Sequence, residues 1–207
     1  MGSRRLGRRR LYALEKLGQD SNMTEGIGID AAIGHSKLSR DGTQVTTEIY
    51  IDLGTSGGTM ASSGGVGDHV IGLSGSQSAE AGPVGAAFLC QLSDTVNGII
   101  HDVELTCVEA VAGDGEPDLN VIYSDSATLR FASPTGSGGA TSVKLVEAGT
   151  DLVAGDNVTA TVDNNAASGK YLYLATGAGD SVDIDDGDYT GGKLILRLYG
   201  SVVPDDV

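Results

Sequence analysis

The chain has few aromatic residues, and its high glycine content disfavours helices. Its 207 residues include no Trp and only two Phe, and aromatic residues make up 4% of the sequence. So few rings disfavour base stacking and sugar stacking as activities of the body. Gly, in contrast, occurs 32 times, about twice its usual share of roughly 7%. Because each interior Gly destabilises a helix by about 1 kcal/mol, this composition favours short strands joined by glycine turns.

Cysteines and long apolar runs are also scarce. The two cysteines are too few for a disulfide framework. Cys90 lies in the apolar run VGAAFLCQL and Cys107 alternates in phase with apolar neighbours, so we expect both thiols to be reduced and buried. No segment approaches the roughly 18 apolar residues of a membrane helix, and no secretory signal follows the basic start. We therefore expect synthesis in the cytoplasm of the cell that makes the chain and no membrane partner.

Positive charge is rare outside the N-terminus. Residues 1–16 carry five arginines, Lys16 and Glu15, a local charge of +5. The net charge of the chain is -15, which leaves -20 for residues 17–207. Like charges at one terminus are typical of an interaction arm, and an acidic body repels nucleic acid. Arginine-rich arms bind acidic protein surfaces, here either other copies of the acidic body or an acidic partner.

Residues 1–18 are expected to form this basic arm and to contain a short helix. Leucines recur three residues apart in RRRLYALEKL, and Gly18 follows where a helix often ends. A helix of about ten residues is marginal alone, so we expect it to become ordered against a partner; a disordered solubilising tail is the alternative. The expected partner-binding residues are Arg4, Arg5, Leu6, Arg8, Arg9, Arg10, Leu11, Tyr12, Leu14 and Leu17.

The rest of the chain is expected to be a linker, residues 19–44, followed by one all-β domain, residues 45–207. In VTTEIYIDL, apolar residues and Thr47 alternate with polar residues from Val45 to Leu53, as in a half-buried strand. About ten short strands are expected between residues 45 and 200, each bounded by Gly, Asp, Asn or Ser. Such spacing is typical of an antiparallel β-sandwich or jelly-roll-like body.

Two local arrangements can be predicted within this domain. The segments TEIYIDLG and LILRLYG, near its two ends, are expected to pair as neighbouring strands. Asn97-Gly98 stands between two strand-like runs and is expected to form a tight hairpin turn.

Motifs for catalysis or cofactor binding are incomplete. GIGIDA begins like a dinucleotide fingerprint but has Ala31 where the third Gly should be, and GLSGS lacks the spacing of a nucleophile elbow. His35, His69 and His101 lack the spacing of a zinc site. A serine triad assembled only in the fold stays open. We expect no enzyme, no catalytic residue, no cofactor and no metal ligand.

An aspartate-rich segment, DSVDIDDGDYTGGK, precedes the last expected strand. Clustered carboxylates can hold calcium in a loop. With Gly187 in the turn position, the first and third ligand places of an EF-hand fall on Val182 and Ile184, so the register is wrong. An acidic solvated turn is the simpler interpretation, and a bound cation is the open alternative.

Several segments resemble a known group of proteins. TEIYIDLG, GDHVIGLSG, GAAFLCQLSDTVNGIIHDVELTCVEA, YLYLATG and DYTGGKLILRLYG together resemble virion structural proteins of marine tailed bacteriophages. RRLGRRRLYALEKLGQ resembles the basic leader of some of them. The resemblance spans most of the chain and rests on strand-and-turn patterns. It implies a capsid decoration or cement protein, often a homotrimer, bound outside the head where major capsid protein subunits meet.

The expected function is therefore structural. The chain would bind the major capsid protein lattice through its arginine-rich arm, stabilise the shell and reside in the virion as a homotrimer or other homo-oligomer. A tail, neck or fibre component, a receptor or carbohydrate-binding module, and an internal DNA-facing protein are the alternatives. DNA is disfavoured because 27 acidic residues outside residues 1–16 stand against seven basic ones.

Overall fold

The computed structural model describes eleven strands and pairs all of them antiparallel. The described residues are 29, 32–54, 60–62, 69–73, 86–114, 117–129, 133, 142–147, 151–162, 167–177 and 187–202. The all-β prediction is confirmed for this part of the chain. It contains no helix with the length and apolarity to span a membrane.

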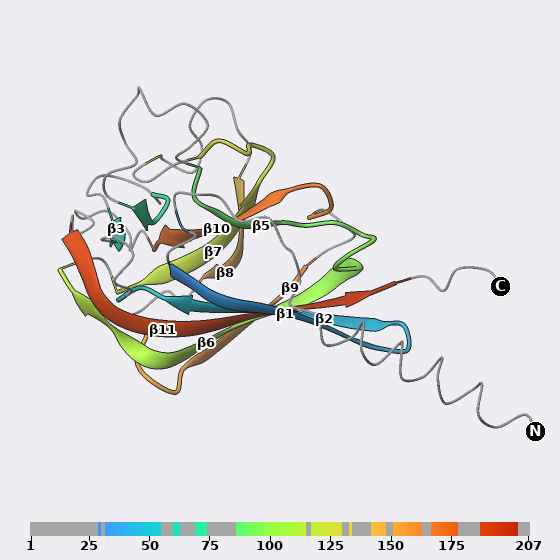
Figure 1. The fold of residues 1–207 in the computed structure, drawn as a ribbon, viewed down its shortest axis with the longest axis horizontal. Helices are drawn as coiled ribbons and strands as arrows, with labels where there is room; N and C mark the ends of the chain where they lie inside the picture. The colour runs from blue at the N-terminus through green and yellow to red at the C-terminus, as the bar shows by residue number, and fades with distance from the viewer. Residues whose placement is uncertain are drawn as a thin grey trace, which may run out of the picture.

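Seven strands form a large curled sheet. Five of them lie side by side in the order β1, β2, β11, β6, β9, and two short strands extend the sheet beyond β2 along β11. Figure 1 shows β11 and β6 curving together as the two longest strands. The strands are β1 (Ile33–Asp41), β2 (Gln44–Asp52), β3 (Met60–Ser62), β4 (Gly72–Leu73), β6 (Ile99–Gly113), β9 (Asn157–Thr161) and β11 (Gly187–Ser201).

Four strands form a smaller sheet, which lies above the large sheet in the view of Figure 1. Every residue of β7, one of its two central strands, is buried, so both faces of this strand are covered. The order is β5 (Phe88–Gln91), β10 (Tyr171–Thr176), β7 (Leu119–Ser124) and β8 (Ser142–Glu147).

Four antiparallel pairs are nested within the sequence. The outermost pair joins β2 to β11, the next joins β5 to β10, then β6 to β9, and the innermost joins β7 to β8. The pairs alternate between the large sheet and the small sheet. The predicted pairing of TEIYIDLG with LILRLYG is the outermost of them and is confirmed.

The core lies on one face of the large sheet and includes residues of both sheets. On adjacent strands Ile49, Leu196 and Leu105 stand opposite one another, and each is 0% exposed. Burial of each such side chain stabilises the fold by about 1.5–3 kcal/mol. The predicted inward face of residues 45–53 is confirmed, because its alternate side chains are at most 2% exposed. Cys90 and Cys107 are buried free thiols, as predicted.

The predicted linker, residues 19–44, is wrong where β1 forms. Ile33–Asp41 pairs with β2, and a two-residue turn with Gly42 at φ 62° joins the two strands. Few apolar side chains mark β1 because it is an edge strand, held mainly by the backbone of its neighbour. The body also begins earlier than predicted, since Ile29 is already fully buried in the core.

The predicted hairpin at Asn97-Gly98 is also wrong. The strands on either side, β5 and β6, belong to different sheets, so the turn carries the chain from one sheet to the other. Asn97 is buried: its side-chain oxygen accepts a 2.9 Å bond from the Ser93 backbone N–H, and its Nδ2 donates to Thr47 Oγ1 at 2.9 Å. Gly98 has φ 73° and lies against Ser201, which leaves no room for a side chain.

Candidate functional site

The residues predicted to bind a partner lie outside the described residues. All ten belong to the arm, residues 1–18, and the structure places none of them. They are Arg4, Arg5, Leu6, Arg8, Arg9, Arg10, Leu11, Tyr12, Leu14 and Leu17. The candidate site within the described residues is therefore a different one.

This site is a row of charged side chains across the large sheet, on the face opposite the core. We call this face the outer face. Lys37 on β1 stands opposite Glu48 on β2, Glu48 opposite Arg197 on β11, and Arg197 opposite Glu104 on β6. We call these four residues the charged row. Neighbouring strands are about 4.8 Å apart, so side chains at one level of the sheet can bond directly to one another.

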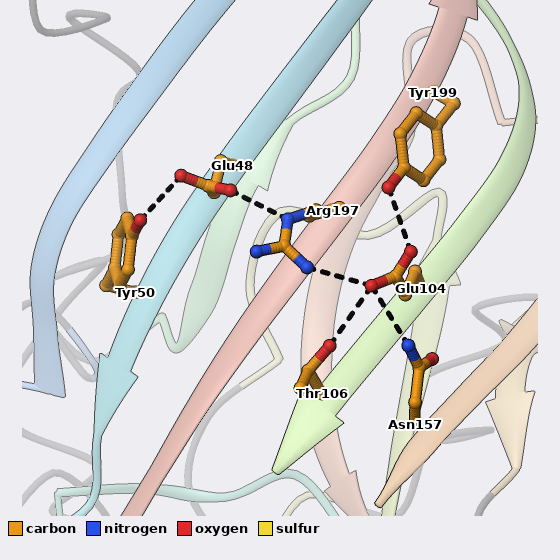
Figure 2. Close-up of polar contacts among 7 residues, drawn as sticks. All are labelled: Glu48, Tyr50, Glu104, Thr106, Asn157, Arg197 and Tyr199. Atoms are coloured by element: carbon orange, nitrogen blue, oxygen red, sulfur yellow. Dashed lines mark hydrogen bonds and ion pairs between the residues drawn. The ribbon is translucent and has the colours of Figure 1, made fainter. Parts of the chain in front are cut away.

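Arg197 links the two carboxylates of the row. Its Nε donates to Glu48 Oε2 at 2.7 Å, and a terminal nitrogen donates to Glu104 Oε1 at 2.8 Å. Figure 2 shows the guanidinium lying between the two carboxylates, with its remaining nitrogen joined to neither. The three side chains come from three adjacent strands, so this bridge exists only in the observed register.

Neutral donors complete the site. Tyr50 Oη donates to Glu48 at 2.6 Å, and Tyr199 Oη donates to Glu104 at 2.8 Å. Glu104 also accepts bonds from Thr106 Oγ1 and Asn157 Nδ2, each at 3.1 Å. A carboxylate offers about four lone-pair positions. Three of the four donors to Glu104 share its Oε1 and only Tyr199 bonds to Oε2, whereas on Glu48 the bonds from Tyr50 and Arg197 fill one position on each oxygen.

These side chains are partly buried by one another. The exposed fractions are 27% for Arg197, 19% for Glu48 and 17% for Glu104. The hydrogen bond from Tyr50 and the Arg197 guanidinium hold the pKa of Glu48 below its ordinary value of 4.5, against the effect of burial. Burial opposes ionisation of Glu104 most strongly, yet the bonds from Tyr199, Arg197 and Thr106 together lower its pKa as well.

The lowered pKa values decide what this site can do chemically. A general acid near neutral pH needs a raised carboxyl pKa, and both carboxylates have the opposite shift. Arg197 stays charged, because its bonds to Glu48 raise its pKa further. The row is thus a fixed array of charges and hydrogen-bonding groups, which suits recognition of another surface better than proton transfer.

The other titratable groups that the structure describes form smaller sets, such as the ion pair of Lys193 with Glu109. His101 Nδ1 contacts Asp102 Oδ2 at 2.8 Å, which lowers the pKa of Asp102. His69 is buried beside β10, where its backbone N–H bonds to Thr176. Within the described residues, no three His, Cys, Asp or Glu side chains are grouped to hold a metal. Of the aspartates in the predicted acidic turn, Asp188 is exposed on β11, and the others lie outside the described residues.

Sequence reasoning missed the charged row. The alternation in β2 indicates that Glu48 and Tyr50 face outward. It gives no sign that Arg197, 149 residues further along the chain, bonds to Glu48. The predicted pairing of the two segments, aligned at the observed register, would have brought them together.

Comparison of the chain with protein-family models, curated proteins and solved structures gave no match.

Proposed function

We propose that this chain is a structural virion protein, a decoration or cement protein of a tailed-bacteriophage head. In this proposal the arginine-rich arm binds the major capsid protein lattice, and the body remains on the outside of the shell as part of a homo-oligomer. The observation that carries the proposal is the charge division, +5 in residues 1–16 against -20 in the remainder. The resemblance of the strand segments to virion proteins of marine tailed phages supports it.

We also propose that the body is a jelly-roll sandwich. The four nested pairs support this fold, because a jelly roll is a long hairpin of eight strands wrapped so that successive pairs enter alternate sheets. In this interpretation β1, β3 and β4 are additions to the eight. Jelly rolls occur in viral capsid proteins and in lectins, so the fold agrees with the proposed role without deciding it.

The arm has enough chain to reach a neighbouring protein. Ile29 is the first described residue, and it is anchored in the core. The twelve residues that lead from Leu17 to Ile29 can span up to about 40 Å when extended. An arm of this reach can bind a shell subunit while the body keeps its own fold, and each attachment then raises the effective concentration of the other.

The contacts that the arm makes on binding must offset the conformational entropy that it loses when it becomes ordered. Fixing a backbone opposes binding by about 1–2 kcal/mol per residue. The proposed contacts therefore combine burial of the apolar residues of the arm with pairing of its arginines to carboxylates. The apolar residues are Leu6, Leu11, Tyr12, Leu14 and Leu17.

Neutralising the arm in the full chain tests this proposal. In the arm variant, the five arginines of residues 4–10 are replaced by Gln. We expect it to keep its fold and to lose co-sedimentation with purified shells that lack the protein. A control replaces three body cations that lie outside the charged row, Arg40, Lys144 and Lys170, by Gln, and should sediment with the shells. Equal binding by the arm variant and the unmodified chain would refute an anchoring arm.

An internal DNA-facing protein is the second candidate, because the arm is as basic as many DNA-packaging arms. It predicts that the unmodified chain binds duplex DNA with an affinity that falls steeply as salt rises. It also predicts that a protease cannot reach the arm in intact particles. The decoration proposal expects weak DNA binding and a body that the protease can reach.

A further inference from the structure

The outer face of the large sheet is a large surface that no other described element covers. On β1, β2, β6, β9 and the part of β11 that pairs with β2, every outer-face side chain whose exposure the structure describes is exposed or partly exposed, whereas the alternate side chains of β2 are buried. Four strands about 4.8 Å apart and about nine residues long cover roughly 19 Å by 30 Å. The accessible area of side chains exceeds this planar area, so the face approaches the ~800 Å² that each partner buries in a standard interface.

The charges on this face follow a regular order. The charged row reads positive, negative, positive, negative from β1 to β6. At another level Asp52 on β2 stands opposite Lys193 on β11, and Lys193 also forms an ion pair with Glu109 on β6. Consider a line that runs between β2 and β11, parallel to the strands. Reflection across this line exchanges β2 with β11 and β1 with β6. Each member of the charged row, and each residue of the pair Asp52 and Lys193, then falls on a residue of opposite charge.

We propose that a second copy of this chain docks on the outer face about a two-fold axis that runs between β2 and β11, nearly parallel to the strands. Such an axis places β2 opposite β11 of the partner subunit and β1 opposite β6 of the partner subunit. Two sheets that pack face to face keep their strands within about 30° of each other, as this arrangement requires. A two-fold contact closes on itself, so its product is a dimer.

The axis puts opposite charges together at both of these levels. Glu48 faces the partner's Arg197, Lys37 faces the partner's Glu104, and Asp52 faces the partner's Lys193. Symmetry makes each of these contacts occur twice. Tyr50 faces the partner's Ile195 next to the charged row, which adds an aromatic–aliphatic contact near the axis.

Unused hydrogen-bonding capacity lies on the two residues nearest the axis. A guanidinium has five N–H donors, and Arg197 uses two of them within its own subunit. Glu48 keeps about half of its lone-pair positions after the bonds to Tyr50 and Arg197. The pair formed by Glu48 and the partner's Arg197 can therefore form without breaking any bond of the monomer.

If the two-fold axis is shifted sideways by half the distance between strands, opposite charges no longer face each other. An axis along β11 places Glu48 opposite the partner's Glu104, and an axis along β2 places Lys37 opposite the partner's Arg197. Like charges in direct opposition weaken an interface by several kcal/mol. The charge order thus favours the axis between β2 and β11 over its immediate neighbours.

Paired charge reversals in the full chain test the proposal. Asp52→Lys and Lys193→Asp each create two like-charge contacts in a homodimer, so each variant alone should dimerise at least about tenfold more weakly than the unmodified chain. An equimolar mixture of the two restores both contacts and should recover dimers. Sedimentation velocity over a range of protein concentrations measures the association, and circular dichroism verifies the fold of each variant.

Exposed residues away from the outer face provide the control. Asp151→Lys and Lys144→Asp change the same charges, and both variants should dimerise like the unmodified chain. Dimers that weaken as salt rises, together with recovery on mixing, support the proposal. A monomer throughout the micromolar range, a trimer, or a mixture that associates no better than its components would overturn it. Because only the purified chain is used, these outcomes are independent of the proposed virion role.

Discussion

The two faces of the large sheet are made by the same strands and differ in what holds their side chains. On the inner face, Ile49 and Leu196 stand opposite each other and are fully buried by the core. One residue along each strand, Glu48 and Arg197 stand opposite each other on the outer face and are held mainly by bonds within the sheet. A slip of one residue would exchange the two faces, so burial of the inner face fixes the register on which the outer bonds depend.

The largest expected effect comes from truncating the inner face. Leu196→Ala should lower the free energy of unfolding by about 2–5 kcal/mol, because it leaves a cavity where no solvent enters. Ile195→Ala, at the next position of the same strand, removes a side chain that is only partly buried and should cost well under half as much. Urea unfolding of the two variants measures both. Equal losses would contradict the division between the faces.

A smaller loss is expected when the charged row loses its cation. Arg197→Met should lower the free energy of unfolding by about 1–3 kcal/mol, since Glu48 and Glu104 are then partly buried without a counter-charge. Arg197→Lys keeps the charge and should lose less, because a single ammonium bridges two carboxylates poorly. Thermal unfolding at neutral pH ranks the two variants. A stable Arg197→Met variant would show that the outer bonds contribute nothing.

Acid should weaken the same bonds. The pKa values of Glu48 and Glu104 are lowered in the folded chain, so the unfolded chain takes up protons first as the pH falls. Stability from these groups is therefore present above their ordinary value of 4.5 and is lost as the pH drops through the lowered values. A Glu48→Gln/Glu104→Gln variant should lose less stability than the unmodified chain between neutral pH and this acidic range. If the stability of the variant and of the unmodified chain fell equally with pH, the lowered pKa values of Glu48 and Glu104 would be contradicted. Asp151→Asn, which removes an exposed carboxylate outside the charged row, is the control.

The smallest expected effect is the difference between two residues of β9, one that bonds to the charged row and one that does not. Asn157→Ala removes one of the four donors to Glu104 and should cost about 0.5 kcal/mol. Thr159→Ala, exposed on the same short strand, removes no bond to the row and should change stability by less than this. Urea unfolding of both, each with Ala on β9, measures the difference. A larger loss from Thr159→Ala would show that strand propensity outweighs the bond.

Sequence predicted the parts of the fold that burial determines. The alternation of Val45 to Leu53 and the buried thiols needed only the local pattern of apolar residues. The edge strand β1 lacks that pattern, and the turn at Asn97-Gly98 has the residues of a hairpin but connects two sheets. The local sequence could not have prevented either error, because both the strand β1 and the turn depend on which strands become neighbours in the fold.

The candidate site was less predictable than the fold. The outward direction of Glu48 followed from alternation, but its partner Arg197 is brought to it by a register between strands 149 residues apart. Polar side chains carry no periodic signal that identifies such a partner. The arm was the opposite case, since its charge is obvious in the sequence and its residues lie outside those the structure describes.

The proposed role in a virion is tested most directly by counting and locating the chain in purified particles. Quantitative mass spectrometry gives its copy number relative to the major capsid protein, and gold-labelled antibody gives its position. The proposal predicts hundreds of copies per particle on the outer surface of the head. A handful of copies at the tail or neck, or a chain found only inside the shell with the DNA, would contradict it.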